Sequence, residues 1–236
     1  MPSESGVPQK RSPSLAEIKK RTLKPVDAWW TVLVIDPIAI RLLWLLVRIF
    51  PRTSPNTVTS ASLLVGLLAA TAFLTKHLAW GALLYQVAFA LDCIDGKLAR
   101  LRARPSTLGA FWDGFVNNLV YGACITAFVA GNYSREPMLV PLGCTLLATW
   151  ALHVFLTYEM QKGDAASWTA IRPPEGSWLA RHRLLPPFTF PDKHAIALTL
   201  GPLIGQITYG FAATCLLEVL SMGLKFRTVL RQKQHQ

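Results

Sequence analysis

Charged residues are scarce in this chain, and their scarcity excludes an ordinary soluble domain. Only 16% of its 236 residues are charged, against about 25% in typical soluble proteins. Hydrophobic residues make up 52% of the sequence, and the mean hydropathy is +0.34. The sequence therefore predicts an integral membrane protein with a single domain.

Three kinds of motif are also missing. Residues 1–25 are polar and basic, without the apolar core of a cleavable signal peptide, so we expect a cytosolic tail. The four cysteines fall in apolar segments without metal-ligand spacing, which is typical of buried thiols. Basic residues do not alternate with aromatic ones, so the net charge of +11 indicates no nucleic-acid partner.

Apolar runs long enough to span a bilayer need about 20 residues. Four such runs are present, and a final apolar block divides at Gly201, Pro202 and Gly205 into a short and a longer helix. The sequence predicts an all-α polytopic membrane protein with six transmembrane helices, at residues 55–75, 77–101, 107–131, 137–161, 194–206 and 208–227.

A further apolar run, residues 36–53, precedes these spans. Asp36 is expected to cap its start, and Pro37 suits a first helical turn. Arg41, Arg48 and Arg52 interrupt the run, which favours an amphipathic helix in the membrane interface. A seventh span is the alternative.

The distribution of positive charge orients these segments. With both termini in the cytoplasm, only Lys76 and Arg135 of the 24 basic residues lie outside. The basic residues then also contact anionic membrane lipids. We therefore predict a cytosolic basic tail (1–35), an interfacial helix (36–53), a transmembrane catalytic domain (54–228) and a second cytosolic tail (229–236).

Three aspartates lie in two of the predicted spans, close to the cytosolic ends. On helices, the spacing places two groups of residues in one stripe each: Asp92, Asp95, Gly96, Ala99 and Arg100 on one helix, and Gly109, Asp113 and Asn117 on the next. An ionisable group inside a span costs a few kcal/mol. Asp92, Asp95 and Asp113 are therefore candidate ligands of one or two divalent cations, with Mg²⁺ suited to carboxylates and substrate phosphates. The alternative is a structural salt-bridge cluster with Lys97, Arg100, Arg102 and Arg104.

The two stripes carry a specific resemblance. "DCIDGKLAR", eight residues and "GAFWDGFVN" resemble the signature D-x-x-D-G-x-x-A-R, eight residues, G-x-x-x-D-x-x-x-D of the CDP-alcohol phosphotransferases. Seven of the eight fixed positions match, and Asn117 replaces the last aspartate. The "SPNTVT" that opens the first span also fits this family.

The resemblance implies a site open to the cytosol, where a CDP-linked lipid binds with two ions of Mg²⁺ or Mn²⁺ and an acceptor hydroxyl displaces CMP. Asp92, Asp95 and Asp113 would be metal ligands, and Gly96, Ala99, Arg100 and Gly109 would line the nucleotide and diphosphate site. Asn117 stands where the family has its general base. A homodimer is also implied. Separately, we expect the protein to lie in the plasma membrane.

An amide cannot take a proton from a hydroxyl at ordinary pH, so Asn117 leaves three hypotheses. The acceptor could need little deprotonation, or be activated by a metal or another residue. The site could act on another diphosphate, such as a prenyl diphosphate, in prenyl transfer or cyclisation. The protein could also be a non-catalytic binding subunit.

The acceptor side is less defined. Lys162, Arg172, Arg181 and Arg183 follow the fourth span on the cytosolic side, where they could hold an anionic acceptor or simply reflect the membrane charge bias. His153 and His194 have no partner at ligand spacing, and we interpret both as structural.

Overall fold

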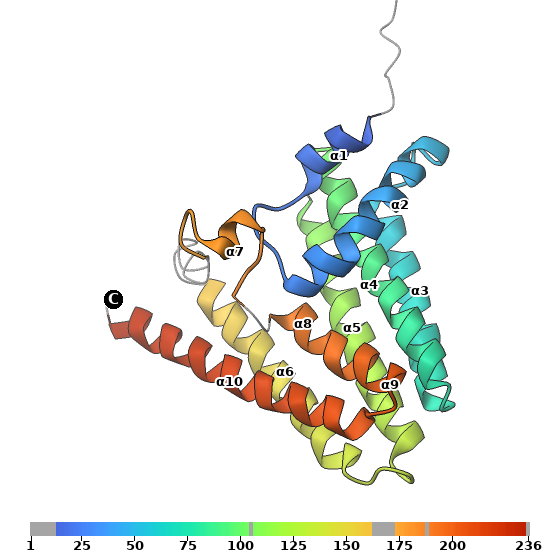
Figure 1. Ribbon diagram of the computed structural model, residues 1–236, viewed down its shortest axis with the longest axis vertical. Helices are drawn as coiled ribbons and strands as arrows, with labels where there is room; N and C mark the ends of the chain where they lie inside the picture. The colour runs from blue at the N-terminus through green and yellow to red at the C-terminus, as the bar shows by residue number, and fades with distance from the viewer. Residues whose placement is uncertain (1–12, 104–105, 162–172, 187–188, 235–236) are drawn as a thin grey trace, which may run out of the picture.

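The protein is an all-α bundle, as the sequence predicted (Figure 1). The computed structural model describes residues 13–103, 106–161, 173–186 and 189–234. Its longest helices are α3 (Pro55–Leu74), α4 (Leu78–Leu101), α5 (Thr107–Asn132), α6 (Leu139–Gln161) and α10 (Ile207–Gln234). Shorter helices are α1 (Leu15–Thr22), α2 (Asp36–Ile49), α7 (Trp178–Arg181), α8 (Phe190–Ala195) and α9 (Gly201–Leu203), with π-helical turns η1 (Thr31–Ile35) and η3 (Ile196–Leu200).

Four helices in the described part of the chain, α3 to α6, are long and apolar enough to cross a membrane. The first 17 residues of α10, Ile207–Gly223, form a shorter apolar helix. The continuous segment α8–η3–α9 would rise only about 20 Å, less than the roughly 30 Å hydrocarbon core. The membrane bundle therefore combines four full-length helices with two shorter apolar segments close to the predicted ranges.

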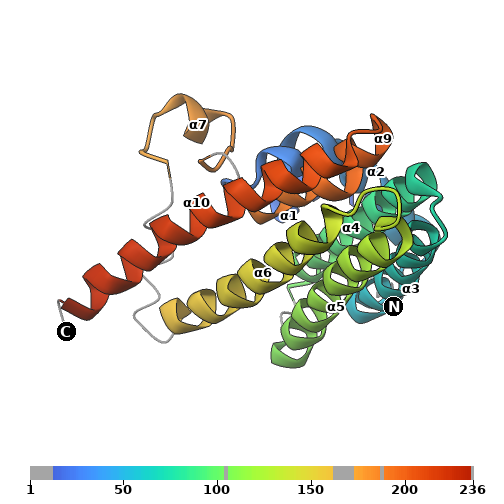
Figure 2. The same cartoon turned by 90° about the horizontal axis from the view of Figure 1, so that it is seen from below.

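The bundle has two parts (Figures 1 and 2). Helix α3 packs along both α4 and α5, and α10 packs along α6. Between these groups, the α8–η3–α9 segment contacts α4 and α10. Large apolar side chains on α5 and its neighbours form the core at this junction, with Phe73, Tyr121, Phe128 and Phe211 almost fully buried.

Local caps explain where the first spans begin. The side chain of Ser54 accepts a hydrogen bond from the Thr57 amide, and that of Ser106 accepts one from the Gly109 amide, at 3.1 and 2.9 Å. Pro55 occupies the first turn of α3, where its missing amide hydrogen costs nothing. These caps start α3 and α5 at the positions that the sequence predicted.

The segment before the first span differs from the prediction in one respect. Asp36 does not cap α2, because the π-helical turn η1 runs directly into that helix. Instead, its buried carboxylate pairs with Lys97 at 2.8 Å and with Arg183 at 3.1 Å. Part of the predicted tail also folds onto the bundle, since Ile18 of α1 is fully buried and α1 contacts α2 and α4. Whether α2 lies in the interface or crosses the membrane stays a prediction.

A glycine turn joins the last two apolar segments. Gly205, with φ of 71°, lies in the left-handed region that favours glycine, and α10 begins two residues later. The helices then cross closely: a Cβ added to Gly210 would lie 3.1 Å from the Ile196 carbonyl oxygen and 3.2 Å from the Gly201 Cα. The absence of side chains at Gly201 and Gly210 thus lets α10 pack closely against the α8–η3–α9 segment.

Candidate active site

The three aspartates of the motif converge, although they come from two helices. Asp92 and Asp95 lie on α4 and Asp113 on α5, and one carboxylate oxygen from each lies within 4.8 Å of the others. Helix α3 packs against both α4 and α5 and so sets their relative position. The stripes predicted from helical spacing therefore face each other.

Each aspartate has a different hydrogen-bonding environment. Asp95 Oδ2 accepts a hydrogen bond from Thr59 Oγ1 of α3, a contact buried in the bundle. Asp113 Oδ1 accepts one from Asn117 Nδ2 at 2.9 Å. Asp92 Oδ1 is buried without a hydrogen-bond partner among the described residues. Since buried carboxylate oxygens are normally paired, the cluster is suited to a ligand with positive charge.

The nearby cations are engaged elsewhere, which argues against the salt-bridge alternative. Lys97 pairs with Asp36, Arg100 Nε donates to the Thr22 carbonyl oxygen at 2.8 Å, and Arg102 donates to the Pro51 carbonyl oxygen at 2.8 Å. Arg104 lies outside the described residues. Among the described residues, no ion pair joins a cation to any of the three aspartates.

A cavity of about 510 Å³ opens beside the cluster at the ends of α4 and α5. Asp95 and Asp113 lie in its wall. All four residues expected at the nucleotide and diphosphate site line it as well: Gly96, Ala99, Arg100 and Gly109. The structure therefore brings these predicted residues together in one space, which we call the motif cavity.

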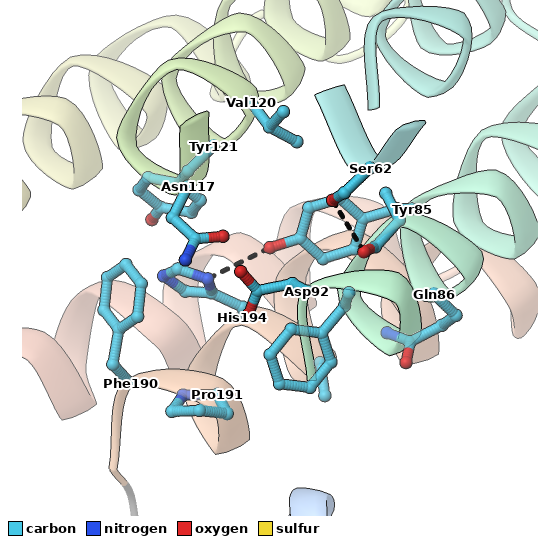
Figure 3. A pocket seen from close by; sticks show the side chains of 13 residues that line it. Ser62, Tyr85, Gln86, Asp92, Asn117, Val120, Tyr121, Phe190, Pro191 and His194 are labelled. Atoms are coloured by element: carbon cyan, nitrogen blue, oxygen red, sulfur yellow. Dashed lines mark hydrogen bonds between the residues drawn. The ribbon is translucent and has the colours of Figure 1, made fainter. Parts of the chain in front are cut away.

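A second cavity has a volume of about 200 Å³ (Figure 3). Asp92 and Asn117 line it, and we call it the inner cavity. Its wall also contains Tyr85 and His194, whose Oη and Nδ1 are 3.0 Å apart in a hydrogen bond. The two cavities thus divide the predicted residues between them.

Two residues at the site were missed from the sequence. Thr59 belongs to the "SPNTVT" stretch that fits the family, but its contact with Asp95 depends on the packing of α3 against α4. His194 was interpreted as structural, because no partner lies at ligand spacing in the sequence. Its partner Tyr85 is on α4, far away along the chain.

Of the basic residues considered for an acceptor, Arg183 is bound to Asp36 and to the Lys24 carbonyl oxygen. Arg181 closes α7 on the surface and is exposed. Lys162 and Arg172 lie outside the described residues. No described contact therefore links this group to the aspartates.

Comparison with known proteins assigns the family. Residues 52–217 match the CDP-alcohol phosphatidyltransferase family. The chain belongs to this family. The matched range contains every residue of the aspartate cluster and of both cavities. The family assignment therefore agrees with the signature seen in the sequence.

Two curated relatives share parts of the sequence. The bifunctional IPC transferase and DIPP synthase of Thermococcus kodakarensis is 35% identical over 87 residues, which are 37% of this chain and 20% of that protein. The phosphatidylinositol phosphate synthase of Corynebacterium glutamicum is 32% identical over 123 residues, 50% of this chain and 54% of that one. The chain thus spans about half or less of these relatives.

Solved structures of the Mycobacterium tuberculosis phosphatidylinositol phosphate synthase share the fold. The complex with CDP-DAG has a TM-score of 0.60 at 17% identity and covers 82% of this chain and 94% of that one. The complex with manganese and citrate has a TM-score of 0.58 at 18% identity, covering 84% and 89%. The protein is accordingly an integral membrane member of a transferase family.

Proposed function

We propose that this protein is a divalent-metal-dependent phosphotransferase, which moves a phospho-alcohol group from a CDP-linked lipid to an acceptor and releases CMP. The aspartate cluster carries this proposal, because three carboxylates converge beside a large cavity without a paired cation among the described residues. Family membership and the relatives named for phosphatidylinositol phosphate synthesis support the substrate class.

The donor set of the cluster fits Mg²⁺ or Mn²⁺. Such hard cations take oxygen ligands from carboxylates, waters and substrate phosphates, and the buried, unpaired Asp92 Oδ1 is available to such an ion. Asp92, Asp95 and Asp113 would hold the ions, two as the resemblance implies. When bound, the metal would supply positive charge to the diphosphate oxygens.

The other residues of the motif cavity act on the donor. Gly96, Ala99 and Gly109 present little bulk, so the diphosphate can approach the helix backbones. The hydrogen bond from Arg100 Nε to Thr22 fixes the guanidinium at the rim, where it can bind a phosphate oxygen. Asn117, in the wall of the inner cavity, holds the Asp113 carboxylate through its amide and is unable to serve as a base.

We also propose that the motif cavity opens to the cytoplasm, with both termini on that side of the plasma membrane, and that the protein forms a homodimer. The charge distribution supports the orientation. In intact cells of a cysteine-free background, a membrane-impermeant maleimide should label Arg135→Cys and spare Arg102→Cys. The reverse pattern would contradict the orientation, and the mass of the purified protein in detergent tests the dimer.

The decisive experiment measures CMP release by the purified protein. We expect release with CDP-diacylglycerol, Mn²⁺ or Mg²⁺ and a suitable acceptor from a panel of alcohols and phosphorylated alcohols. Chelation of the metal with EDTA should stop release, and added Mn²⁺ should restore it.

Two results would contradict this function. Tight CDP-diacylglycerol binding without turnover on any acceptor would indicate a non-catalytic subunit. Pyrophosphate release from a prenyl diphosphate, with no CMP release from the CDP-lipid, would indicate the other diphosphate chemistry.

A further inference from the structure

His194 lines the inner cavity together with Asp92 and Asn117 (Figure 3). The family motif does not include His194. Only 5% of this residue is exposed. Its Nε2 is buried without a hydrogen-bond partner among the described residues. Buried polar atoms are rarely left unpaired, so this atom is available to a bound ligand.

The imidazole ring is held on several sides. Nδ1 is 3.0 Å from Tyr85 Oη. Tyr121 stacks on the ring face with centroids 3.8 Å apart and an angle of 4°, and Phe190 meets it edge-on at 3.4 Å. These contacts restrict the ring to one orientation and leave its Nε2 edge for a ligand.

The helix that carries His194 is fixed as well. Lys193 pairs with Glu218 of α10 at 2.8 Å, and both side chains are almost completely buried. At the start of α8, Asp192 accepts hydrogen bonds from the Thr189 and Trp30 amides. Contacts with four separate parts of the chain therefore determine the position of His194 relative to α4 and α5. They come from Trp30, Tyr85, Tyr121 and Glu218.

The direction of the hydrogen bond between Tyr85 Oη and Nδ1, which follows the tautomer of the ring, decides what Nε2 can do. A neutral imidazole carries one N–H, and the partner of one nitrogen selects the role of the other. When Nδ1–H donates to Tyr85 Oη, Nε2 is left as a hydrogen-bond acceptor. A hydroxyl beside Asn117 would then find at His194 the base that the amide cannot provide.

We propose that His194 binds the acceptor hydroxyl and takes its proton, the role that the family's last aspartate would have at position 117. This inference rests on the proposed phosphotransfer. The acceptor oxygen bonds to the phosphorus of the phospho-alcohol group, and the bond from that phosphorus to the bridging oxygen of CMP breaks, with its electron pair leaving on CMP. The hydroxyl proton moves to Nε2 and later returns to solvent.

The wall of the inner cavity also defines the class of acceptor. Among its described lining residues there is no Lys or Arg, whereas Ser62 and Gln86 add uncharged polar groups. A phosphate or carboxylate there would find no cationic side chain among these residues to pair with. The group that enters this cavity is therefore the hydroxyl end of the acceptor, in an uncharged part of that molecule.

The test combines substitutions at the two positions. His194→Gln keeps a polar side chain but cannot take a proton, so we expect kcat for CMP release to fall by about 10²–10⁴-fold. The KM for CDP-diacylglycerol and its binding should not change. Adding Asn117→Asp to His194→Gln should restore turnover at least tenfold, because a carboxylate then stands at the motif position. In the unmodified protein, Asn117→Asp should raise kcat less than it does in the variant.

His77→Gln is the matched control, since His77 is exposed at the opposite end of α4, and it should keep unmodified activity. The inference is wrong, with the phosphotransfer still standing, when His194→Gln keeps its kcat. It is also wrong when the lost activity is not restored by Asn117→Asp, whether or not the variant remains folded and binds CDP-diacylglycerol. If the unmodified protein releases no CMP with any acceptor, both proposals fail.

Discussion

The two cavities beside the aspartate cluster differ in how they are built. The motif cavity is lined by residues from Ser54 to Asp113, which belong to three consecutive helices and their connections. The inner cavity adds four residues from α8, a helix much later in the chain: Phe190, Pro191, His194 and Ala195. The first space therefore follows from the motif spacing on neighbouring helices, and the second depends on how the other half of the bundle packs against them.

The largest effect should come from the cluster that both cavities share. Asp113→Asn keeps the shape of the side chain but removes a proposed metal ligand, so CMP release should fall by about 10²–10³-fold, as for other groups that stabilise a transition state. Mn²⁺ binding, followed by electron paramagnetic resonance, should weaken in parallel. Glu17→Gln, at an exposed acid of α1, is the control. Full activity of Asp113→Asn would refute the metal assignment.

The position of α8 in the wall of the inner cavity should depend on the buried ion pair between Lys193 and Glu218. Glu218→Leu leaves Lys193 charged and unpaired in the core, so the free energy of unfolding should fall by about 3–5 kcal/mol. Adding Lys193→Met should recover most of this loss, because the unpaired charge is then removed. Denaturation in detergent measures both variants.

An exposed pair provides the comparison for this prediction. Glu17 and Arg21 are 3.3 Å apart, with both side chains about half exposed. Breaking that pair with Glu17→Ala should cost about 0.5 kcal/mol or less. Equal losses at the two pairs would show that the Lys193–Glu218 contact does not hold α8 and α10 together.

A smaller effect is expected at Thr59, which supports the cluster from α3. Thr59→Val removes the hydrogen bond to Asp95 while keeping the side-chain shape, so Mn²⁺ affinity should fall by about 10–100-fold. Thr71→Val is the control, because Thr71 lies on the same helix and bonds only to its own helix backbone at Leu67. Equal Mn²⁺ affinities in the two variants would leave Thr59 without a role in the site.

The smallest effect is expected at Gly96, where a substitution should change substrate binding in the motif cavity without changing the stability of α4. A Cβ added to Gly96 would meet Arg100 Nη1 at 3.5 Å, an ordinary contact, so Gly96→Ala should fold normally. It should nevertheless raise the KM for CDP-diacylglycerol several-fold, because the methyl group enters the motif cavity. Gly114→Ala meets nothing within 4 Å and is the matched control. An unchanged KM in Gly96→Ala would place the diphosphate elsewhere.

The sequence by itself determined the membrane class, the four long spans and the eight motif positions. These features depend on local properties: apolar length, serine caps before α3 and α5, and the helical period that puts residues three and four apart on one face. The two stripes could be predicted for the same reason, whereas the convergence of Asp92, Asp95 and Asp113 depends on α3, which packs against both α4 and α5.

The tertiary structure alone decided which distant side chains complete the site. Asp36 could have capped a helix, yet it pairs with Lys97 and Arg183 because η1 continues into α2 and α7 ends nearby. His194 had no partner in the sequence pattern, yet Tyr85 and Asn117 meet it in one cavity. Such contacts join residues far apart in the chain, and their geometry follows from how whole helices pack, which no local spacing encodes.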